Sequence, residues 1–186
     1  MRTDVRLEDW RVAAAGAAAE RFHESVFFTG NGRMGARGYV ALRPEPRPLD
    51  AGLFMAGMFD RITESSPLTD FVNLPTPIYL GLEAGDAPLG PAAEVERELD
   101  LSSGLLSLRY AAQGPGGSTE VYERRFFSMA RPGWLFQRVE LTEGAGLCLR
   151  AGIDCAARNR PIPGDQGKEN SEALPMTCRI APSGGP

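Results

Sequence analysis

The sequence is poor in the residues from which most metal centres are built. It contains a single histidine, His23, and three cysteines, Cys148, Cys155 and Cys178. One histidine cannot assemble a histidine-based metal site, and no Cys-x-x-Cys spacing is present to hold zinc. The odd cysteine count also disfavours a disulfide framework, so we expect three thiols in a reducing compartment. We therefore predict that the chain holds no metal ion.

Long apolar runs and an excess of basic residues are also missing. No stretch approaches the roughly 20 consecutive apolar residues that a membrane helix needs. Lysine and arginine together number 20 against 24 acidic residues, a net charge of -4, so no positive field attracts a nucleic-acid backbone. Residues 1–9 are charged and lack the apolar core of a signal peptide. These features predict a cytoplasmic protein with neither nucleic acid nor membrane as partner.

Helix signals are few, whereas turn residues are abundant. The 22 glycines and 15 prolines are spread along the chain, which favours many short elements joined by turns. The Ala-rich stretch Val12–Arg21 is the candidate helix, although Gly16 interrupts it at a cost of about 1 kcal/mol relative to Ala. The composition therefore favours an all-β fold.

Three segments alternate apolar and polar residues with a period of two, the pattern of half-buried antiparallel strands. The expected inward faces are Leu106, Leu108 and Tyr110 in Leu105–Tyr110, Leu135, Val139 and Leu141 in Trp134–Thr142, and Leu147, Leu149 and Ile153 in Leu147–Asp154. Gly- and Pro-rich turns at 114–117, 131–133 and 143–146 separate the predicted strands. Two more strands are expected at Tyr122–Met129 and Phe71–Leu82, the latter with Pro75 and Pro77 at an edge or bend. The pattern predicts an antiparallel β-sandwich.

Candidate catalytic groups are present but carry no specific arrangement. Glu94, Glu96, Glu98 and Asp100 alternate along one segment, which indicates a solvated strand face rather than a paired-carboxylate centre. Neither Ser25 nor Ser128 has a neighbouring base or lies in a Gly-x-Ser-x-Gly elbow. We expect His23 to be a surface or hydrogen-bonded polar residue rather than a catalytic one. No catalytic residue is assigned.

The glycines of residues 30–38 match a nucleotide motif by letters alone. Gly30-x-Gly32-x-x-Gly35 is the dinucleotide fingerprint, but that fingerprint needs a helix after it. Here a tight turn at Gly30–Gly32 is followed by a strand-like stretch, Met34–Leu42, so we reject nucleotide binding. Five aromatic residues could stack on sugar rings, but in a sandwich we expect them in the core: Trp10, Phe54, Phe59, Tyr79 and Trp134.

Six blocks in order, within about residues 10–170, resemble glycoside hydrolase family 65, the family of maltose, trehalose and kojibiose phosphorylases. They are ESVFFTGNGRMGARG at 24–38, AGLFMAGMFD at 51–60, DFVNLP at 70–75, LDLSSGLL at 99–106, RRFFSM at 124–129 and NRPIPGDQ at 159–166. Two positions depart from the family pattern: Arg33 replaces an aromatic or apolar residue, and Thr69-Asp70 replaces the usual acid.

The resemblance implies a fold and an activity that the composition does not show. The family begins with a large antiparallel β-sandwich, a supersandwich similar to that of galactose mutarotase. An (α/α)6 barrel follows and carries the general-acid glutamate and the phosphate site. The implied reaction is inverting phosphorolysis of an α-glucoside, with inorganic phosphate as co-substrate, no cofactor, and a homodimeric enzyme. No position of this sequence matches the motif of the catalytic acid.

The resemblance therefore predicts a non-catalytic N-terminal β-sandwich region, residues 1–170, that supports an absent barrel acting on α-glucosidic disaccharides. We expect this sandwich to be incomplete and to expose unpaired strand edges. Residues 173–186 do not resemble the family, and we expect an irregular tail at 171–186 from a reading frame truncated or shifted near Asn170. If the domain lends a loop to the sugar site, the candidates are Gly30, Asn31, Gly32, Arg33 and Asn73.

Two other functions stay open. The first is a stand-alone carbohydrate-binding module of the same fold, with Trp10 or Trp134 as reporters of sugar binding. The second is a sugar mutarotase, which rests on fold analogy alone. It ranks last, because the acid–base design that this enzyme class resembles needs a pair of histidines and the chain has only His23.

Overall fold

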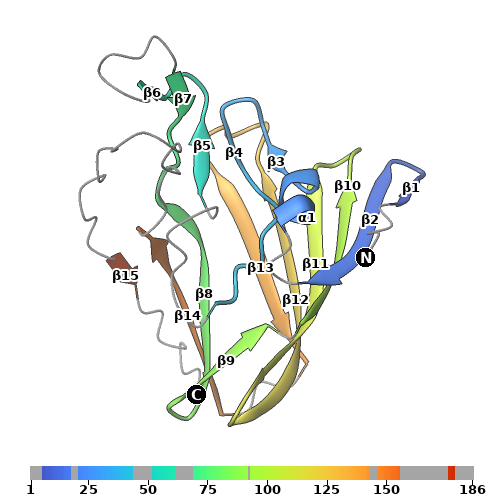
Figure 1. Ribbon diagram of the computed structural model, residues 1–186, viewed down its shortest axis with the longest axis vertical. Helices are drawn as coiled ribbons and strands as arrows, with labels where there is room; N and C mark the ends of the chain where they lie inside the picture. The colour runs from blue at the N-terminus through green and yellow to red at the C-terminus, as the bar shows by residue number, and fades with distance from the viewer. Residues whose placement is uncertain are drawn as a thin grey trace, which may run out of the picture.

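The computed structural model describes residues 6–17, 21–43, 52–61, 69–91, 93–142, 146–155 and 176–178. One short helix accompanies fifteen strands in these ranges (Figure 1). The elements are β1 (Arg6–Glu8), β2 (Arg11–Ala17), α1 (Arg21–Val26), β3 (Thr29–Gly30), β4 (Met34–Ala36), β5 (Leu53–Met55), β6 (Phe59–Arg61), β7 (Thr69–Phe71), β8 (Thr76–Ala84), β9 (Ala87–Pro91), β10 (Glu94–Asp100), β11 (Leu105–Gly114), β12 (Gly117–Phe127), β13 (Leu135–Leu141), β14 (Leu147–Asp154) and β15 (Met176–Cys178).

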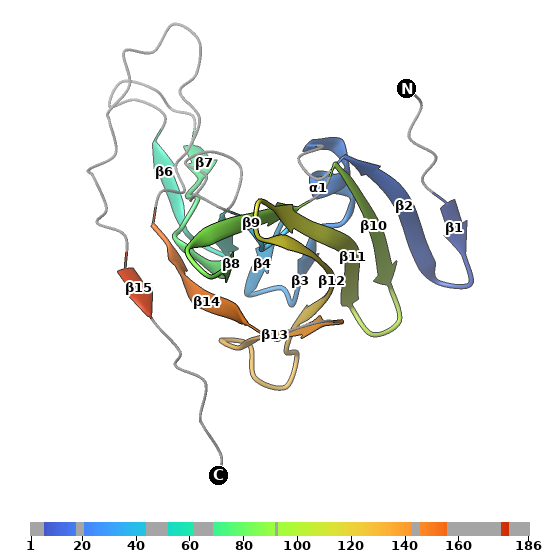
Figure 2. The ribbon, with the colours of Figure 1, turned by 90° about the horizontal axis from the view of Figure 1, so that it is seen from below.

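Strand β11 is the branch point of the architecture. Its first half pairs with β10 and its residues Ala112 and Gln113 pair with β9, while β12 runs along its other edge. One layer therefore has the order β1-β2-β10-β11-β12-β13, and β9 leads into a second layer with the order β9-β8-β14-β15. Every pair of described strands is antiparallel, and the two layers curve around a common interior (Figure 2). The predicted all-β antiparallel sandwich is confirmed.

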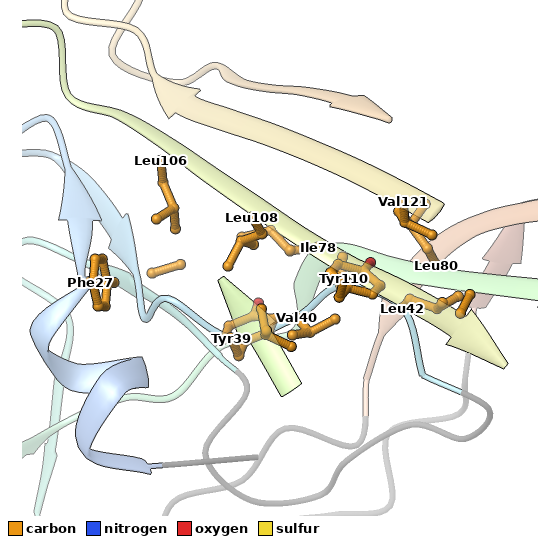
Figure 3. Packing of buried hydrophobic residues seen from close by; sticks show 14 of the residues in the cluster. Phe27, Tyr39, Val40, Leu42, Ile78, Leu80, Leu106, Leu108, Tyr110 and Val121 are labelled. Atoms are coloured by element: carbon orange, nitrogen blue, oxygen red, sulfur yellow. The ribbon is translucent and has the colours of Figure 1, made fainter. Parts of the chain in front are cut away.

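A single apolar cluster joins the two layers (Figure 3). Ile78, Leu80 and Leu82 enter it from β8, whereas Leu106 and Leu108 enter it from β11. These side chains are nearly or fully buried and alternate with less buried neighbours, which is the period of two of half-buried strands. Burial of this cluster is the main force that holds the layers together.

An extended segment, residues 37–43, passes through the interior between the layers. Residues 39–43 are almost completely buried, yet only Leu42 forms a ladder bridge, a parallel one to Leu80. Buried backbone groups need partners, and those of this segment find them one by one. The Gly38 amide donates to Glu24 O at 2.7 Å, and the Arg43 amide donates to Leu80 O at 2.9 Å. The segment is thus a buried extended connection between the two layers rather than a strand of either sheet.

Most predicted strands are confirmed with changed bounds. Leu106, Leu108 and Tyr110 are buried in β11 as expected, and Glu94, Glu96 and Glu98 form the solvated face of β10. The expected strand at Phe71–Leu82 is divided into β7 and β8, with Pro75 between them and Pro77 exposed within β8. The expected strand at Met34–Leu42 ends at Ala36, because the chain then leaves the sheet for the interior.

Two expectations about periodicity are wrong. Val12–Arg21 is not a helix: its first part lies in β2, which pairs with β10 over seven residues, and the helix α1 starts only at Arg21. Tertiary pairing overrides the helix propensity of alanine. In β14, Ile153 is exposed, because the register shifts between Gly152 and Asp154 and Asp154 takes the buried position. Leu149 lies opposite the buried Leu82, on the expected face, but is 36% exposed.

The expectation that large aromatic side chains fill the core is also wrong in part. Trp10, Phe59 and Trp134 are exposed, whereas Phe54 and Tyr79 are half-buried. Trp10 is 71% exposed and has a positive φ of 64°, since it forms the two-residue turn between β1 and β2 with Asp9. Of the predicted tail 171–186, only the backbone of β15 is described, and its predicted irregularity lies outside the described residues.

Candidate functional site

The most densely connected polar group is the carboxylate of Glu123, on the inner face of β12. Glu123 is fully buried, and its Oε1 accepts bonds from Arg125 Nη1 at 2.6 Å and Gln137 Nε2 at 3.2 Å. Its Oε2 accepts bonds from the Ala41 amide at 3.1 Å and Tyr110 Oη at 3.3 Å. Four donors on one carboxylate compensate the loss of water on burial. The carboxylate thereby ties the interior segment 37–43 to β11, β12 and β13.

Arg125 completes this anchor from the same strand. Its Nη2 donates to Tyr39 O at 2.5 Å and to Arg37 O at 3.2 Å, and its side chain is fully buried. Arg125 and Glu123 are two residues apart on one face of β12, so the alternation of the strand itself brings the pair together. A fixed guanidinium fork that meets backbone carbonyls holds the segment in one register.

A second ion pair anchors the other end of the segment to the second layer. Arg43 Nη2 lies 3.1 Å from Asp154 Oδ2 and donates to Ile78 O at 3.2 Å, and the side chains of both members of the pair are almost completely buried. Between the two anchors lies Tyr39, whose ring centroid is 5.1 Å from the Arg125 guanidinium carbon and 5.2 Å from that of Arg43. The segment is thus held at one end by the Glu123–Arg125 pair of the first layer, and at the other by the ion pair of its own Arg43 with Asp154 of the second layer.

Tyr39 stays neutral in this setting. Its hydroxyl lies 2.5 Å from Thr76 Oγ1, and burial raises the pKa of Tyr39 to about 12, although the neighbouring Arg125 acts in the opposite direction. Burial, with Glu123 beside it, also raises the pKa of Tyr110 well above its ordinary value. Neither phenol is a proton donor suited to neutral pH. Glu123 and Arg125 are fully buried, and the bonds described above connect the cluster to the interior segment and to the neighbouring strands.

The five loop candidates lie in or beside the small sheet formed by β3, β4 and β5. β3 and β4 form a hairpin whose turn contains Asn31, Gly32 and Arg33, and β5 pairs with β4 on its other side. Residue Leu74 then bridges to Leu53 of β5, which places Asn73 beside the same sheet. The structure therefore places Gly30 at the end of β3, Asn31, Gly32 and Arg33 in the turn that follows it, and Asn73 in the segment between β7 and β8.

The side chain of Asn31 is occupied by structural bonds. Its Oδ1 accepts from the amides of Arg33 at 3.1 Å and Met34 at 3.0 Å, which shapes the turn. Its Nδ2 donates to Ser128 O at 2.8 Å and Pro132 O at 3.0 Å, which ties the hairpin to the loop between β12 and β13. Gly32 has a φ of 80°, which the turn requires. The hairpin is thus built to be rigid.

The side chain of Asn73 packs closely against the backbone of Gly52. A Cβ added at Gly52 would lie 1.1 Å from Asn73 Oδ1, so no other residue than glycine fits at position 52 in this conformation. Arg33 is exposed, and its backbone carbonyl accepts from the Ala56 amide at 2.8 Å. Of the five candidates, Arg33 therefore presents a charged side chain to solvent, and whether it contacts a ligand stays a prediction.

The same end of the molecule carries the loop-end aromatic cluster, defined as Phe28, Phe54, Phe59 and Phe71. The ring centroids of Phe28 and Phe54 lie 6.3 Å apart, and those of Phe54 and Phe71 lie 6.5 Å apart. The Phe71 and Phe59 centroids lie 4.9 Å apart. Phe28, Phe59 and Phe71 are exposed. Exposed apolar side chains that gather in one place are typical of interaction surfaces.

A second group, the aromatic ladder, stands on the outer face of β12 and β13. It consists of Phe126, Phe136 and Trp134, whose exposed fractions are 37%, 41% and 53%. Phe126 and Phe136 are direct cross-strand partners, with ring centroids 5.1 Å apart and planes at 11°, and Trp134 stacks on Phe136 at 5.9 Å. The Arg131 guanidinium lies 5.4 Å from the Trp134 ring. Sequence reasoning missed this group, although Trp134 and Phe136 fall on the outward phase of the predicted strand.

The remaining catalytic candidates contribute nothing that resembles a reaction centre. His23 is fully buried in α1, with the Phe22 and Phe27 rings about it at 6.0 Å and 6.1 Å. Ser25 Oγ donates to Arg21 O, and Ser128 Oγ accepts from the Arg131 amide. Within the described ranges, no three His, Cys, Asp or Glu side chains lie together as a metal site would require. Cys148 and Cys155 are free thiols. No helix in the described part of the chain is long and apolar enough to cross a membrane.

Comparison with known proteins now decides the family. The family description "Glycosyl hydrolase family 65, N-terminal domain" matches residues 15–177. The chain belongs to glycosyl hydrolase family 65. The match starts within β2 and ends within β15, so the six sequence blocks and the sandwich point to one family.

A solved structure supports the fold of this family 65 domain. The chain resembles a putative kojibiose phosphorylase from the human microbiome with a TM-score of 0.59 at 14% sequence identity. The similarity covers 80% of this chain and 21% of the phosphorylase chain, so this chain spans about a fifth of that protein. No curated protein matches the sequence.

Proposed function

We propose that this chain is the non-catalytic N-terminal β-sandwich region of a family 65 enzyme that acts on α-glucosidic disaccharides with inorganic phosphate. Its role is to support an (α/α)6 catalytic barrel, and the family match over residues 15–177 is the observation that carries the proposal. The interior of the described sandwich supports it. The polar groups at its centre, Glu123 and Arg125 above all, hold the fold together rather than face a substrate.

The surface of the domain fits the same role. Exposed aromatic side chains gather in the loop-end aromatic cluster and in the aromatic ladder. The Asn31 side chain connects the β3–β4 hairpin, beside the loop-end aromatic cluster, to the β12–β13 loop, beside the aromatic ladder. Rigid apolar surfaces of this kind are typical of docking sites. We expect the sandwich to work in the cytoplasm, within a homodimeric enzyme.

The test compares the 186-residue chain with the product of the longest reading frame that contains it. Each purified protein is incubated with kojibiose, maltose or trehalose and phosphate, and glucose 1-phosphate is measured. We expect no product from the 186-residue chain and product from the longer one. Deleting residues 15–177 from the longer protein is expected to abolish soluble activity. Glucose 1-phosphate from the 186-residue chain would contradict the proposal.

A stand-alone carbohydrate-binding module is the second candidate, and the exposure of Trp134 is the observation that favours it. Sugar rings bind to the free face of an aromatic ring. In the ladder, the rings stack on one another and Arg131 lies over Trp134, which leaves ring edges rather than open faces. We therefore expect no saturable change in tryptophan fluorescence with millimolar α-glucosides. A saturable change lost in Trp134→Leu but kept in Trp10→Leu would reverse this order.

A further inference from the structure

We propose that the open edge of β13 accepts an extended antiparallel strand from the remainder of the family 65 enzyme. The proposal rests on the proposed function, since it takes the incoming strand from the longer enzyme. Strand β13 pairs with β12 along residues 135–141, and within the described ranges no strand pairs with its other edge. Such an edge presents a row of backbone donors and acceptors ready for another strand.

The inner face of β13 is only partly covered within the described residues. Leu135, Val139 and Leu141 pack against the apolar cluster, yet each is only half-buried. The corresponding residues of the neighbouring strand, Val121 and Phe127 among them, are buried. The core therefore reaches the edge without being closed there. An added strand with apolar side chains on its inner face would complete the burial.

The outer face specifies the charge of the incoming strand. Arg124 and Arg138 are direct cross-strand partners, a like-charge arrangement that is unfavourable by itself. Arg138 pairs with Glu140 at 3.0 Å, and Arg124 makes no ion pair in the described part of the chain. The excess positive charge favours an acidic residue directly opposite Arg138. Next to it, Phe136 and the rest of the aromatic ladder favour a β-branched or aromatic residue.

These facing positions define one chemistry. Read antiparallel to β13, from Leu141 back to Leu135, the partner strand should be apolar, basic, apolar, acidic, polar, β-branched or aromatic, and apolar. The basic position faces Glu140 and the acidic one faces Arg138. The longer enzyme has ample chain to provide it, because the similarity covers only 21% of the phosphorylase chain.

A synthetic peptide tests the chemistry of the edge on the complete 186-residue chain. The probe is the acetylated, amidated peptide Leu-Lys-Val-Glu-Thr-Val-Leu, followed by amide NMR shifts of residues 135–141 up to about 1 mM. We expect saturable shifts confined to β13 and its neighbours. Replacing the Glu of the peptide by Lys should weaken binding about fivefold or more. A peptide N-methylated at alternate residues should not bind, because it cannot complete the ladder.

Matched variants separate the edge from general electrostatics. Arg138→Glu should reverse the preference, so that the Lys peptide binds more tightly than the Glu peptide. Arg11→Glu makes the same charge change on an exposed residue of β2, far along the sheet from β13, and should leave the preference unchanged. Equal binding of both peptides to every variant, or no binding of either peptide, would overturn the proposal.

A second copy of this chain is the competing occupant, and it has its own signature. If two β13 strands paired antiparallel about Val139, Arg138 of each copy would face Glu140 of the other. Concentration-dependent dimers would then be lost in Arg138→Glu and in Glu140→Arg alone and restored on mixing the two variants. That result would assign the edge to self-association and overturn the proposal.

Hydrogen exchange in the longer enzyme tests the source of the strand. We expect the amides of residues 135–141 to exchange at least about 100-fold more slowly there than in the 186-residue chain. Equal exchange in the two proteins would overturn the proposal even if the longer enzyme produces glucose 1-phosphate. Absence of phosphorolysis with peptide binding retained would instead contradict the proposed function alone.

Discussion

At the scale of single residues, the fold depends on charges that are buried and mutually satisfied. Glu123 and Arg125 are fully buried, and each also bonds to groups other than its partner. A buried ion pair is not by itself strongly stabilising, but loss of one member leaves an uncompensated charge. The pair therefore matters to stability chiefly because removing either member would leave the other charge buried without its partner.

Arg125→Met is expected to destabilise the chain by about 3–5 kcal/mol, because it leaves the Glu123 carboxylate buried without its cation. The double variant Glu123→Gln with Arg125→Met should lose less than the sum of the two single changes. Urea unfolding followed by circular dichroism measures both. Arg109→Met is the control: Arg109 is half-exposed and lies 3.4 Å from Glu120, and its loss should cost less than about 1 kcal/mol. Equal costs for the two arginines would contradict this account.

Tyr39 gives the chain a stability limit at alkaline pH. The pKa of Tyr39 is raised to about 12 by burial, against about 10 in an unfolded chain. The buried neutral phenol therefore contributes stability that is complete below pH 10 and lost as the pH rises from about 10 to about 12. The total loss is roughly 2–3 kcal/mol. Unfolding free energies measured across that window should show a shallower fall in Tyr39→Phe, whereas Tyr122→Phe, which removes an exposed phenol, should keep the wild-type fall.

At the scale of elements, the sequence predicts the sheet strands better than the interior segment. Strands such as β11 can be recognised in the sequence, because one face is more buried than the other and apolar residues therefore alternate with polar ones. Segment 37–43 has no such alternation, since successive residues are buried and their partners come from distant strands. The glycines at positions 30 and 32 predicted the tight turn that contains most of the loop candidates, but nothing in the sequence placed Asn73 beside it. The aromatic ladder could not be predicted, because it depends on the pairing of β12 with β13.

The entry of this segment into the interior depends on a missing side chain. A Cβ added at Gly38 would lie 2.4 Å from Phe27 Cβ and 2.7 Å from Phe27 O. Because the clash involves backbone, Gly38→Ala should destabilise the chain by about 1–3 kcal/mol. Gly133→Ala, with no neighbouring atom within 4 Å of the added Cβ, should stay within about 0.5 kcal/mol of the wild type. Thermal unfolding of the pair decides the matter, and a neutral Gly38→Ala would show that the segment can move aside.

At the scale of the whole molecule, the family match and the open edge of β13 describe one situation. The chain spans about a fifth of a related phosphorylase, and among the described residues its first layer ends in a strand that pairs on one edge only. Composition, charge and periodicity anticipated the sandwich because those properties are local. They could not place the edge, since the order of strands in a sheet depends on which segments meet in space.

An open edge beside exposed aromatic side chains makes the isolated chain prone to self-association. Phe136→Lys places a charge on the outer face of β13 and removes a ring from the aromatic ladder, a change that protects edges in natural sheets. We expect the protein concentration at which light scattering begins to rise severalfold, although the lost stacking costs about 0.5–1.5 kcal/mol of stability. Leu101→Lys makes the equivalent change at an exposed residue of the turn between β10 and β11, away from the edge strands of the layer. If Leu101→Lys raised the onset as much as Phe136→Lys, general surface hydrophobicity rather than the β13 edge would drive the association.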